Sequence, residues 1–220
     1  MTAPDRGTVG LNGARTALAA RAAVVLPNPA PLTSVLAGTD PATINTTKGR
    51  PPDQPVALWA HHPDTWTFIA DVLDLDEDRA AFARRLLVDE LLTVLLPLRD
   101  THLPVWLAPA TKDGWTLLFG ARWAPLTPLL TPFPVLYVSS ANATGHRPAA
   151  TAAEAATMFP QDTPILGTAD LRVPHDTTPR QATTTIRLHP NGRLDVHRNG
   201  AQDRAQDNAA AYLSHLRGLA

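Results

Sequence analysis

Two basic residues in a proline-rich segment are the first candidates for chemistry. Lys48 and Arg50 stand two positions apart, and three prolines follow within residues 51–55. On an irregular segment, both cations can be aimed at one anion, since Arg offers a planar fork to oxyanions and Lys a point charge. Prolines restrict the loop, so less entropy is lost on binding. The segment is a candidate anion-binding loop, and the alternative is a solvated surface loop.

Two further polar clusters each adjoin a short apolar run. Residues 139–145 read Ser-Ser-Ala-Asn-Ala-Thr-Gly and include Ser140 and Asn142, whose side chains and backbone N–H groups could face a nucleotide or phosphate. The alternative is a turn followed by a helix cap. The third cluster combines residues 183–186, Thr-Thr-Thr-Ile, with 198–200, Arg-Asn-Gly. Taken alone, this third cluster is typical of a β-hairpin with a polar edge.

Short strands and helices must position these clusters. Apolar runs and turn residues predict strands over 24–26, 56–60, 91–98, 105–108, 115–119, 135–138, 184–188 and 193–197. Helices are predicted over 14–23, 74–87, 126–130, 151–158 and 209–219, while 43–55 and 167–182 are expected to be irregular. Thr151 and Glu154 have the spacing of a capping box. Because strands and helices mix without strict alternation, we expect an α/β fold with a mixed sheet.

Composition narrows the class of protein. The chain has 220 residues, 44% of them hydrophobic, with a net charge of −1. It is therefore expected to bury a core and is not a strongly basic nucleic-acid binder. It contains no Cys, which excludes disulfides, thiolate zinc sites and cysteine nucleophiles. No apolar run approaches the ~18 residues of a membrane span, and no signal peptide is apparent, so a cytoplasmic protein is predicted.

The order and spacing of the clusters are more specific than any one of them. Lys-Gly-Arg-Pro-X-X-X-Pro, Ser-Ser-Ala-Asn-X-Thr-Gly, Thr-Thr-Ile and Arg-X-Gly follow one another along the chain. This series resembles the YrdC-like family, the threonylcarbamoyl-AMP synthases, from about residue 11 to 201. The resemblance implies an α/β twisted open mixed sheet with flanking helices and a large concave cavity. It also implies a tail at 1–10, one YrdC-like domain at 11–201 and a helical extension at 202–220.

The resemblance further implies an activity. Family enzymes are nucleotidyltransferases that convert ATP, bicarbonate and L-threonine into threonylcarbamoyl-adenylate and pyrophosphate, for tRNA threonylcarbamoyladenosine modification. Mg²⁺ would arrive with the nucleotide. Such catalysis rests on positioning and charge stabilisation.

Site roles are carried over from the family motifs to matching positions. Lys48 and Arg50 would hold phosphate and carboxylate oxygens and act as the catalytic cations. The expected nucleotide contacts are, besides these two, Ser140, Asn142, Thr184 and Arg198.

The chain departs from the family pattern on the amino-acid side. Residues 27–34 keep the family's Pro but lack its two Thr and two Gly. Asn28 and Arg122 are the nearest, weaker candidates for substrate binding. Three hypotheses stay open: a divergent synthase with a different acceptor, a nucleotide- or RNA-binding module without catalysis, and a paralogue in a specialised carbamoylation pathway.

Overall fold

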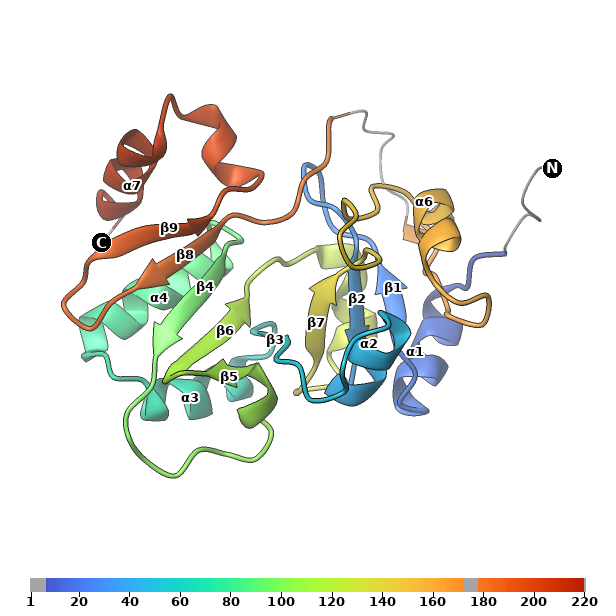
Figure 1. Cartoon of the computed structure of the whole chain (residues 1–220), viewed down its shortest axis with the longest axis horizontal. Coiled ribbons are helices and arrows are strands. Elements are labelled where there is room, and N and C mark those ends of the chain that lie inside the picture. Colours follow the sequence, from blue (N-terminus) through green and yellow to red (C-terminus); the bar gives the residue numbers. More distant parts are fainter. Residues whose placement is uncertain (1–6, 172–177, 220) are drawn as a thin grey trace. The chain divides into compact units, whose positions relative to one another are not determined.

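The computed structural model describes residues 7–171 and 178–219 (Figure 1). They form two compact units. The first comprises residues 7–56, 123–171 and 178–181, and the second comprises 57–122 and 182–219. Each unit therefore combines segments that are far apart in the sequence.

The first unit is built on a short antiparallel sheet. Its strands are β1 (Val24–Leu26), β2 (Val35–Gly38) and β7 (Tyr137–Ser140), with β2 in the middle. Strands β1 and β2 are buried throughout, whereas β7 is buried at its start and becomes half-buried at Ser139 and Ser140. The polar end of β7 is thus accessible to a ligand while its apolar start anchors it in the core.

Short helices surround this sheet. They are α1 (Leu11–Ala19), α2 (Pro41–Thr47), η2 (Ala124–Leu126), α5 (Thr127–Leu130), α6 (Ala152–Met158) and η3 (Ala169–Leu171). The predicted capping of α6 is confirmed: the Thr151 hydroxyl accepts from the Glu154 N–H at 3.1 Å, and the Glu154 carboxylate accepts from the Ala150 N–H at 2.7 Å. Helix α1 ends earlier than predicted, since Arg21 adopts a left-handed conformation with φ of 63°.

The second unit contains a mixed sheet. Its order is β3 (Ala57–Trp59), β6 (Trp115–Phe119), β4 (Thr93–Pro97), β8 (Thr185–Leu188) and β9 (Leu194–Arg198), with β5 (Thr111–Lys112) paired to β6. Strand pairs β3–β6 and β4–β8 are parallel, and the other pairs are antiparallel. The predicted α/β class with a mixed, open sheet and flanking helices is confirmed.

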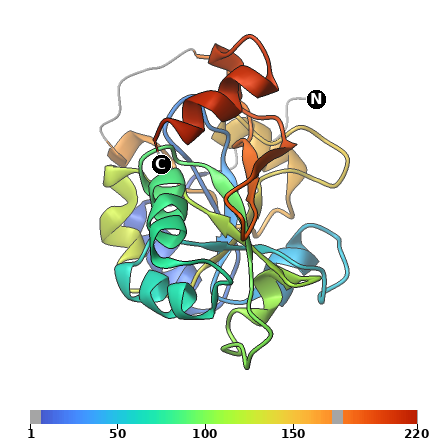
Figure 2. The ribbon, with the colours of Figure 1, turned by 90° about the vertical axis from the view of Figure 1, so that its left-hand side faces the viewer.

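One face of this second sheet is covered. Helices α3 (Pro63–Val72) and α4 (Glu77–Val88) lie on it, and α7 (Ala209–Arg217) packs against β9 (Figures 1 and 2). Val94, Leu118 and Ile186 are fully buried, whereas their strand neighbours Leu117 and Arg187, which point the other way, are only half-buried. The opposite face is therefore partly open. Two short 3₁₀ turns, η1 (Ala108–Ala110) and η4 (Gln202–Ala205), complete the unit.

Three sequence predictions are wrong. Residues 105–108 form no strand; the hairpin partner of β6 is β5, joined by Asp113 and Gly114, both with positive φ as a two-residue hairpin turn requires. Residues 43–47 belong to helix α2, although 43–55 were expected to be irregular. Helix α3 was not predicted, despite Pro63 at its first position. Residues 172–177 of the expected loop 167–182 lie outside the described part.

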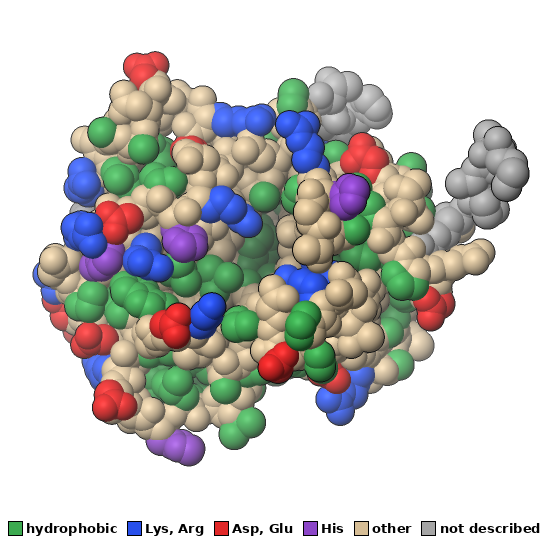
Figure 3. All heavy atoms as spheres, viewed as in Figure 1, with side chains coloured by type: hydrophobic (Ala, Val, Ile, Leu, Met, Phe, Trp, Pro, Cys, Tyr) green, Lys and Arg blue, Asp and Glu red, His purple; other side chains and the backbone are tan. Residues whose placement is uncertain are grey.

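The surface carries charges of both signs. On the face that Figure 3 shows, Lys and Arg side chains are interspersed with Asp and Glu side chains, in keeping with the net charge of −1. Over the described residues, no helix has the length and apolar character needed to cross a membrane.

Candidate anion-binding site

The position of Lys48 and Arg50 follows from how helix α2 begins and ends. Asp40 caps the start by accepting from the Ala42 N–H at 3.0 Å. At the other end Gly49 adopts φ of +66°, its N–H bonds to the Thr46 carbonyl, and the Arg50 N–H bonds to the Asn45 carbonyl, both at 2.9 Å. These two bonds form a Schellman motif. The motif places Lys48 and Arg50 on either side of the left-handed glycine.

A buried amide fixes the loop that follows. The Asn45 Nδ2 atom donates to the Pro52 carbonyl at 3.1 Å and to the Gln54 carbonyl at 2.6 Å. Asn45 has no exposed surface, so both bonds are shielded from water. Because they join α2 to the proline-rich segment, the backbone around Arg50 is held without any ligand.

The second half of the site is the end of strand β7. The β2–β7 register pairs Val35 with Ser140, and the Ala141 N–H then donates to the Ser34 carbonyl at 3.1 Å. Beyond the strand, Asn142 Nδ2 donates to the carbonyls of Ala143 and His146, at 3.0 and 2.9 Å. The loop is thus tied together by one amide side chain, whose oxygen accepts from the Ser140 hydroxyl at 2.5 Å.

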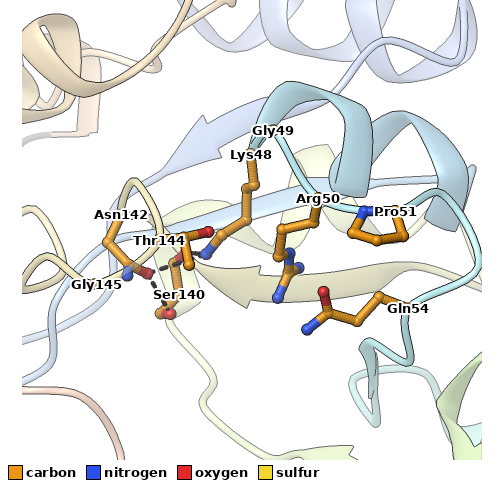
Figure 4. Close-up of a pocket in the computed structure, with 9 residues that line it drawn as sticks. All are labelled: Lys48, Gly49, Arg50, Pro51, Gln54, Ser140, Asn142, Thr144 and Gly145. Carbon is orange, nitrogen blue, oxygen red and sulfur yellow. Dashed lines mark hydrogen bonds between the residues drawn. The ribbon is translucent and has the colours of Figure 1, made fainter.

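The two halves meet at the Lys48 ammonium. Its Nζ atom donates to Asn142 Oδ1 at 2.9 Å (Figure 4). It also donates to Ser139 Oγ at 3.1 Å and to the Ser140 carbonyl. Arg50 Nη2 donates to the same Ser139 hydroxyl at 3.3 Å. The structure therefore brings together four predicted site residues: Lys48, Arg50, Ser140 and Asn142.

These residues line a cavity of about 360 Å³ in the first unit. Its lining consists of Lys48, Gly49, Arg50, Pro51, Gln54, Ser140, Asn142, Thr144 and Gly145. In Figure 4, the ends of the Arg50 and Gln54 side chains point toward one another. No lining residue is acidic, so no carboxylate of the cavity wall neutralises Lys48 and Arg50. The cavity is suited to an anionic ligand with hydrogen-bonding groups.

Burial tunes both cations. Lys48 is only 8% exposed, and burial, reinforced by the nearby Arg50 charge, lowers its pKa to about 7. Burial also lowers the pKa of Arg50. An anion bound beside them would stabilise their charged forms. A bound anion would therefore favour protonation of Lys48 and offset the cost of burying the Arg50 charge.

Sequence reasoning missed three members of this site. Ser139, which accepts from both cations, was recognised as part of the cluster but not assigned a role. Gln54 and Thr144 also line the cavity. The available signal for Ser139 was its position beside Ser140 at the end of a strand. Because successive side chains of a strand point to opposite faces, the two hydroxyls can bond to different residues.

The second unit contains Thr184 and Arg198, the other predicted nucleotide contacts. The Thr184 hydroxyl donates to Asp203 Oδ1 at 2.6 Å, and Thr184 has no exposed surface. Arg198 Nη2 donates to the Thr183 carbonyl at 3.1 Å, and burial lowers the pKa of Arg198. Neither residue lines the cavity around Lys48. Their nucleotide-binding roles stay predictions.

Gly200 packs directly against the backbone of the Thr183-Thr184 segment. A Cβ atom at this position would lie 2.2 Å from the Thr184 backbone N. The Gly200 N–H donates to Asp203 Oδ1 at 2.7 Å. Burial opposes ionisation of Asp203, but hydrogen bonds from Thr184, Asn199 and Gly200 outweigh it and keep the pKa of Asp203 below its usual value. The Arg-Asn-Gly motif at residues 198–200 thus has a structural role, because it lets the chain after β9 pack against the segment that leads into β8.

The two weaker candidates are held by backbone carbonyls. Asn28 is 2% exposed and its Nδ2 atom donates to the Thr33 carbonyl at 2.8 Å. Arg122 donates to the carbonyls of Ala60 and His61, at 2.6 and 3.1 Å. Burial, with repulsion from Arg84, lowers the pKa of Arg122. Their roles in substrate binding stay predictions as well.

The described residues contain no group of three or more His, Asp or Glu side chains that could hold a metal ion. The site consists instead of basic, hydroxyl and amide groups. Such a donor set suits the phosphate oxygens of a nucleotide, while Mg²⁺ would be bound through those phosphates.

Comparison by sequence finds no relative: no family model matches the chain, and no curated protein does. Comparison by structure does. Sua5 of P. abyssi complexed with L-threonine superposes with a TM-score of 0.58 at 19% identity, over 83% of this chain. E. coli YciO gives a TM-score of 0.63 at 12% identity, over 88% of this chain and 90% of its own. The chain has the Sua5/YrdC fold.

A third structure with this Sua5/YrdC fold is full-length HypF in a phosphate- and nucleotide-bound form, with a TM-score of 0.64 and 14% identity. The present chain spans 53% of the length of the L-threonine-bound Sua5 and 25% of that of HypF. It therefore corresponds to one part of those larger proteins.

Proposed function

We propose that this Sua5/YrdC-fold chain binds the phosphates of ATP in the Lys48 cavity and makes a carbamoyl-adenylate. The reaction would convert ATP, bicarbonate and either L-threonine or another amino acid or amine into the adenylate and pyrophosphate. The adenylate would then feed tRNA threonylcarbamoyladenosine modification. The observation that carries the proposal is the convergence of Lys48 and Arg50 with Ser140 and Asn142 in one cavity without a carboxylate.

The chain's own residues would contribute binding and charge stabilisation. When a carbamate oxygen attacks the α-phosphorus, the bond to the leaving pyrophosphate breaks and negative charge grows on its oxygens. Lys48 and Arg50 would stabilise that charge, and their burial away from bulk water supports this role. Ser140 and Asn142 supply hydrogen-bonding groups that orient the nucleotide. No nucleophilic side chain is needed.

The test is pyrophosphate release with each substrate omitted in turn. Release should require ATP, bicarbonate and an amino acid together, and Lys48→Ala should abolish it. Arg217→Ala, which removes an exposed cation at the end of α7, should leave it unchanged. Equal activity in both variants would refute the role of the Lys48 cavity. ATP binding without pyrophosphate release, for any amino acid or amine tried, would refute catalysis and leave a binding module.

A second candidate is a specialised carbamoylation reaction with a different acceptor. It is supported by Asn28-Pro29-Ala30, which replaces the threonine-binding pattern of the family, and by the likeness to nucleotide-bound HypF. Under this candidate L-threonine should give no more pyrophosphate than a reaction without amino acid, while another amine should. Specific stimulation by L-threonine would refute it.

A further inference from the structure

The open face of the second unit's sheet carries a cluster that the proposed function does not use. The β8–β9 register sets Arg187 directly opposite Asp195. Cross-strand neighbours of opposite charge ordinarily pair. Here they do not: Asp195 Oδ2 contacts His189 Nε2 at 2.6 Å, and Asp195 Oδ1 accepts from Arg193 Nη1 at 3.2 Å. Both carboxylate oxygens are therefore engaged by other residues.

Arg187 is held against an aromatic ring instead. Its Cζ atom lies 4.8 Å from the centroid of the Trp115 ring, in the geometry of a cation–π contact. Within the described chain the Arg187 side chain makes no hydrogen bond or ion pair, and its Nε atom is shielded from solvent without a partner. The Arg187 guanidinium is thus half-buried and bonded to no carboxylate, because the oxygens of Asp195, the carboxylate opposite it, are bonded to His189 and Arg193.

Further nitrogen-bearing side chains surround the same tryptophan. The His189 ring meets the Trp115 ring edge-on, with centroids 5.4 Å apart, and Arg193 Nη2 lies 3.0 Å from His189 Nε2. Lys112 is the register partner of Trp115 on strand β5, so its side chain leaves the sheet on the same face. The cluster thus contains three basic side chains, one imidazole and one carboxylate, namely Lys112, Arg187, Arg193, His189 and Asp195.

We propose that this cluster is a second oxyanion-binding site, specific for a phosphate group. The contact with Trp115 restricts the Arg187 side chain. Its guanidinium can therefore offer paired N–H groups to two oxygens of one ligand with little loss of side-chain entropy on binding. A tetrahedral phosphate offers more oxygens than a carboxylate to the donors of Arg187, Arg193 and Lys112. The bound molecule is either free phosphate or a small phosphomonoester.

The experiment is a titration of the full chain followed by the indole N–H resonance of Trp115 in ¹⁵N NMR, assigned with Trp115→Phe. Inorganic phosphate, a simple phosphomonoester and acetate serve as the probes. Lys48→Ala is used as the background, which removes one of the two cations of the first site and so weakens phosphate binding there. Arg187→Gln should weaken phosphate binding about tenfold or more, as loss of a charge-assisted pair of hydrogen bonds would. Arg217→Gln, on α7, is the matched control.

Each outcome decides the proposal. A phosphate-dependent shift of the Trp115 resonance that Arg187→Gln removes and Arg217→Gln retains supports it. Tighter binding of the phosphomonoester than of phosphate identifies an organic ligand, and the reverse identifies free phosphate. Equal affinity for acetate would overturn the phosphate assignment, and no Arg187-dependent shift would overturn the site. Arg187→Lys guards against misfolding, because it keeps the charge and should bind with intermediate affinity.

Discussion

Binding of ATP should be accompanied by proton uptake at Lys48. With a pKa of about 7, this side chain is about 10% protonated at pH 8 in the ligand-free protein. An anion in the cavity favours the ammonium form and moves the pKa back towards its ordinary value of ~10.4. Each binding event at pH 8 should therefore take up about 0.9 proton through Lys48.

The assay is isothermal titration calorimetry at pH 8 in buffers with different heats of ionisation, which together give the number of protons exchanged. The matched variant is Lys48→Arg, which keeps a cation that stays charged across this range. Because the nucleotide's own proton exchange is common to both proteins, their difference isolates Lys48. The dissociation constant of the unaltered protein should also rise as the pH increases above about 7, by up to ~10-fold per unit.

The same pKa shift predicts how stability depends on pH. Between about pH 7 and the ordinary Lys pKa, the unfolded chain binds a proton at Lys48 that the folded chain does not. The contribution of Lys48 to the free energy of unfolding should therefore increase with pH across this window. Equal proton uptake in the unaltered protein and Lys48→Arg, or an ATP affinity independent of pH from 7 to 9, would refute the reasoning.

Three further predictions concern stability measured by urea denaturation, with Gly7→Ala, at an open position, as the common control. Gly49→Ala should lower the free energy of unfolding by about 1 kcal/mol, because only glycine adopts a φ of +66° without strain, and it should also weaken ATP binding; an unchanged ATP affinity would show that the Schellman motif does not position the cations. Gly200→Ala should cost about 3 kcal/mol, since its Cβ would overlap the Thr184 backbone; a loss below that of Gly7→Ala would contradict this packing. Thr151→Ala should cost about 1 kcal/mol by removing the cap of α6, and a neutral result would mean that α6 does not depend on it.

The sequence could predict the chemistry of the site better than the elements that carry it. The resemblance to the YrdC-like family implied one site for Lys48, Arg50, Ser140 and Asn142, and all four line one cavity. Helix α2 was missed because prolines and threonines dominate the segment. Asp40 at the start and Gly49 at the end were the available signals for this helix. Neither residue alone predicts a helix, but an N-cap residue followed nine positions later by a glycine is typical of the two ends of a short helix.

The hydrogen-bond partner of Thr184 was harder to predict for another reason, while the nucleotide-binding roles of Thr184 and Arg198 stay predictions. A hydroxyl at the start of a strand looks the same in sequence whether it faces a ligand or a carboxylate of its own chain. The Asp203 side chain that accepts from Thr184 lies 19 residues further along the chain. Such a pairing depends on how β9 and η4 return towards β8, which is a property of tertiary packing rather than of local pattern. The same holds for β7, whose partner β2 lies about a hundred residues earlier.

The saturated hydrogen bonding of Lys48 links occupancy of the cavity to the mobility of a loop. A lysine ammonium has three hydrogens, and Ser139, Ser140 and Asn142 already accept all three. A ligand oxygen can bond to Nζ only by displacing one of them. If the contact with Asn142 is exchanged, the loop around residues 142–146 loses its anchor to α2, so amide hydrogen exchange there should quicken as the cavity fills. Ligand binding would then increase the mobility of residues 142–146 while its negative charge offsets the charge of Lys48.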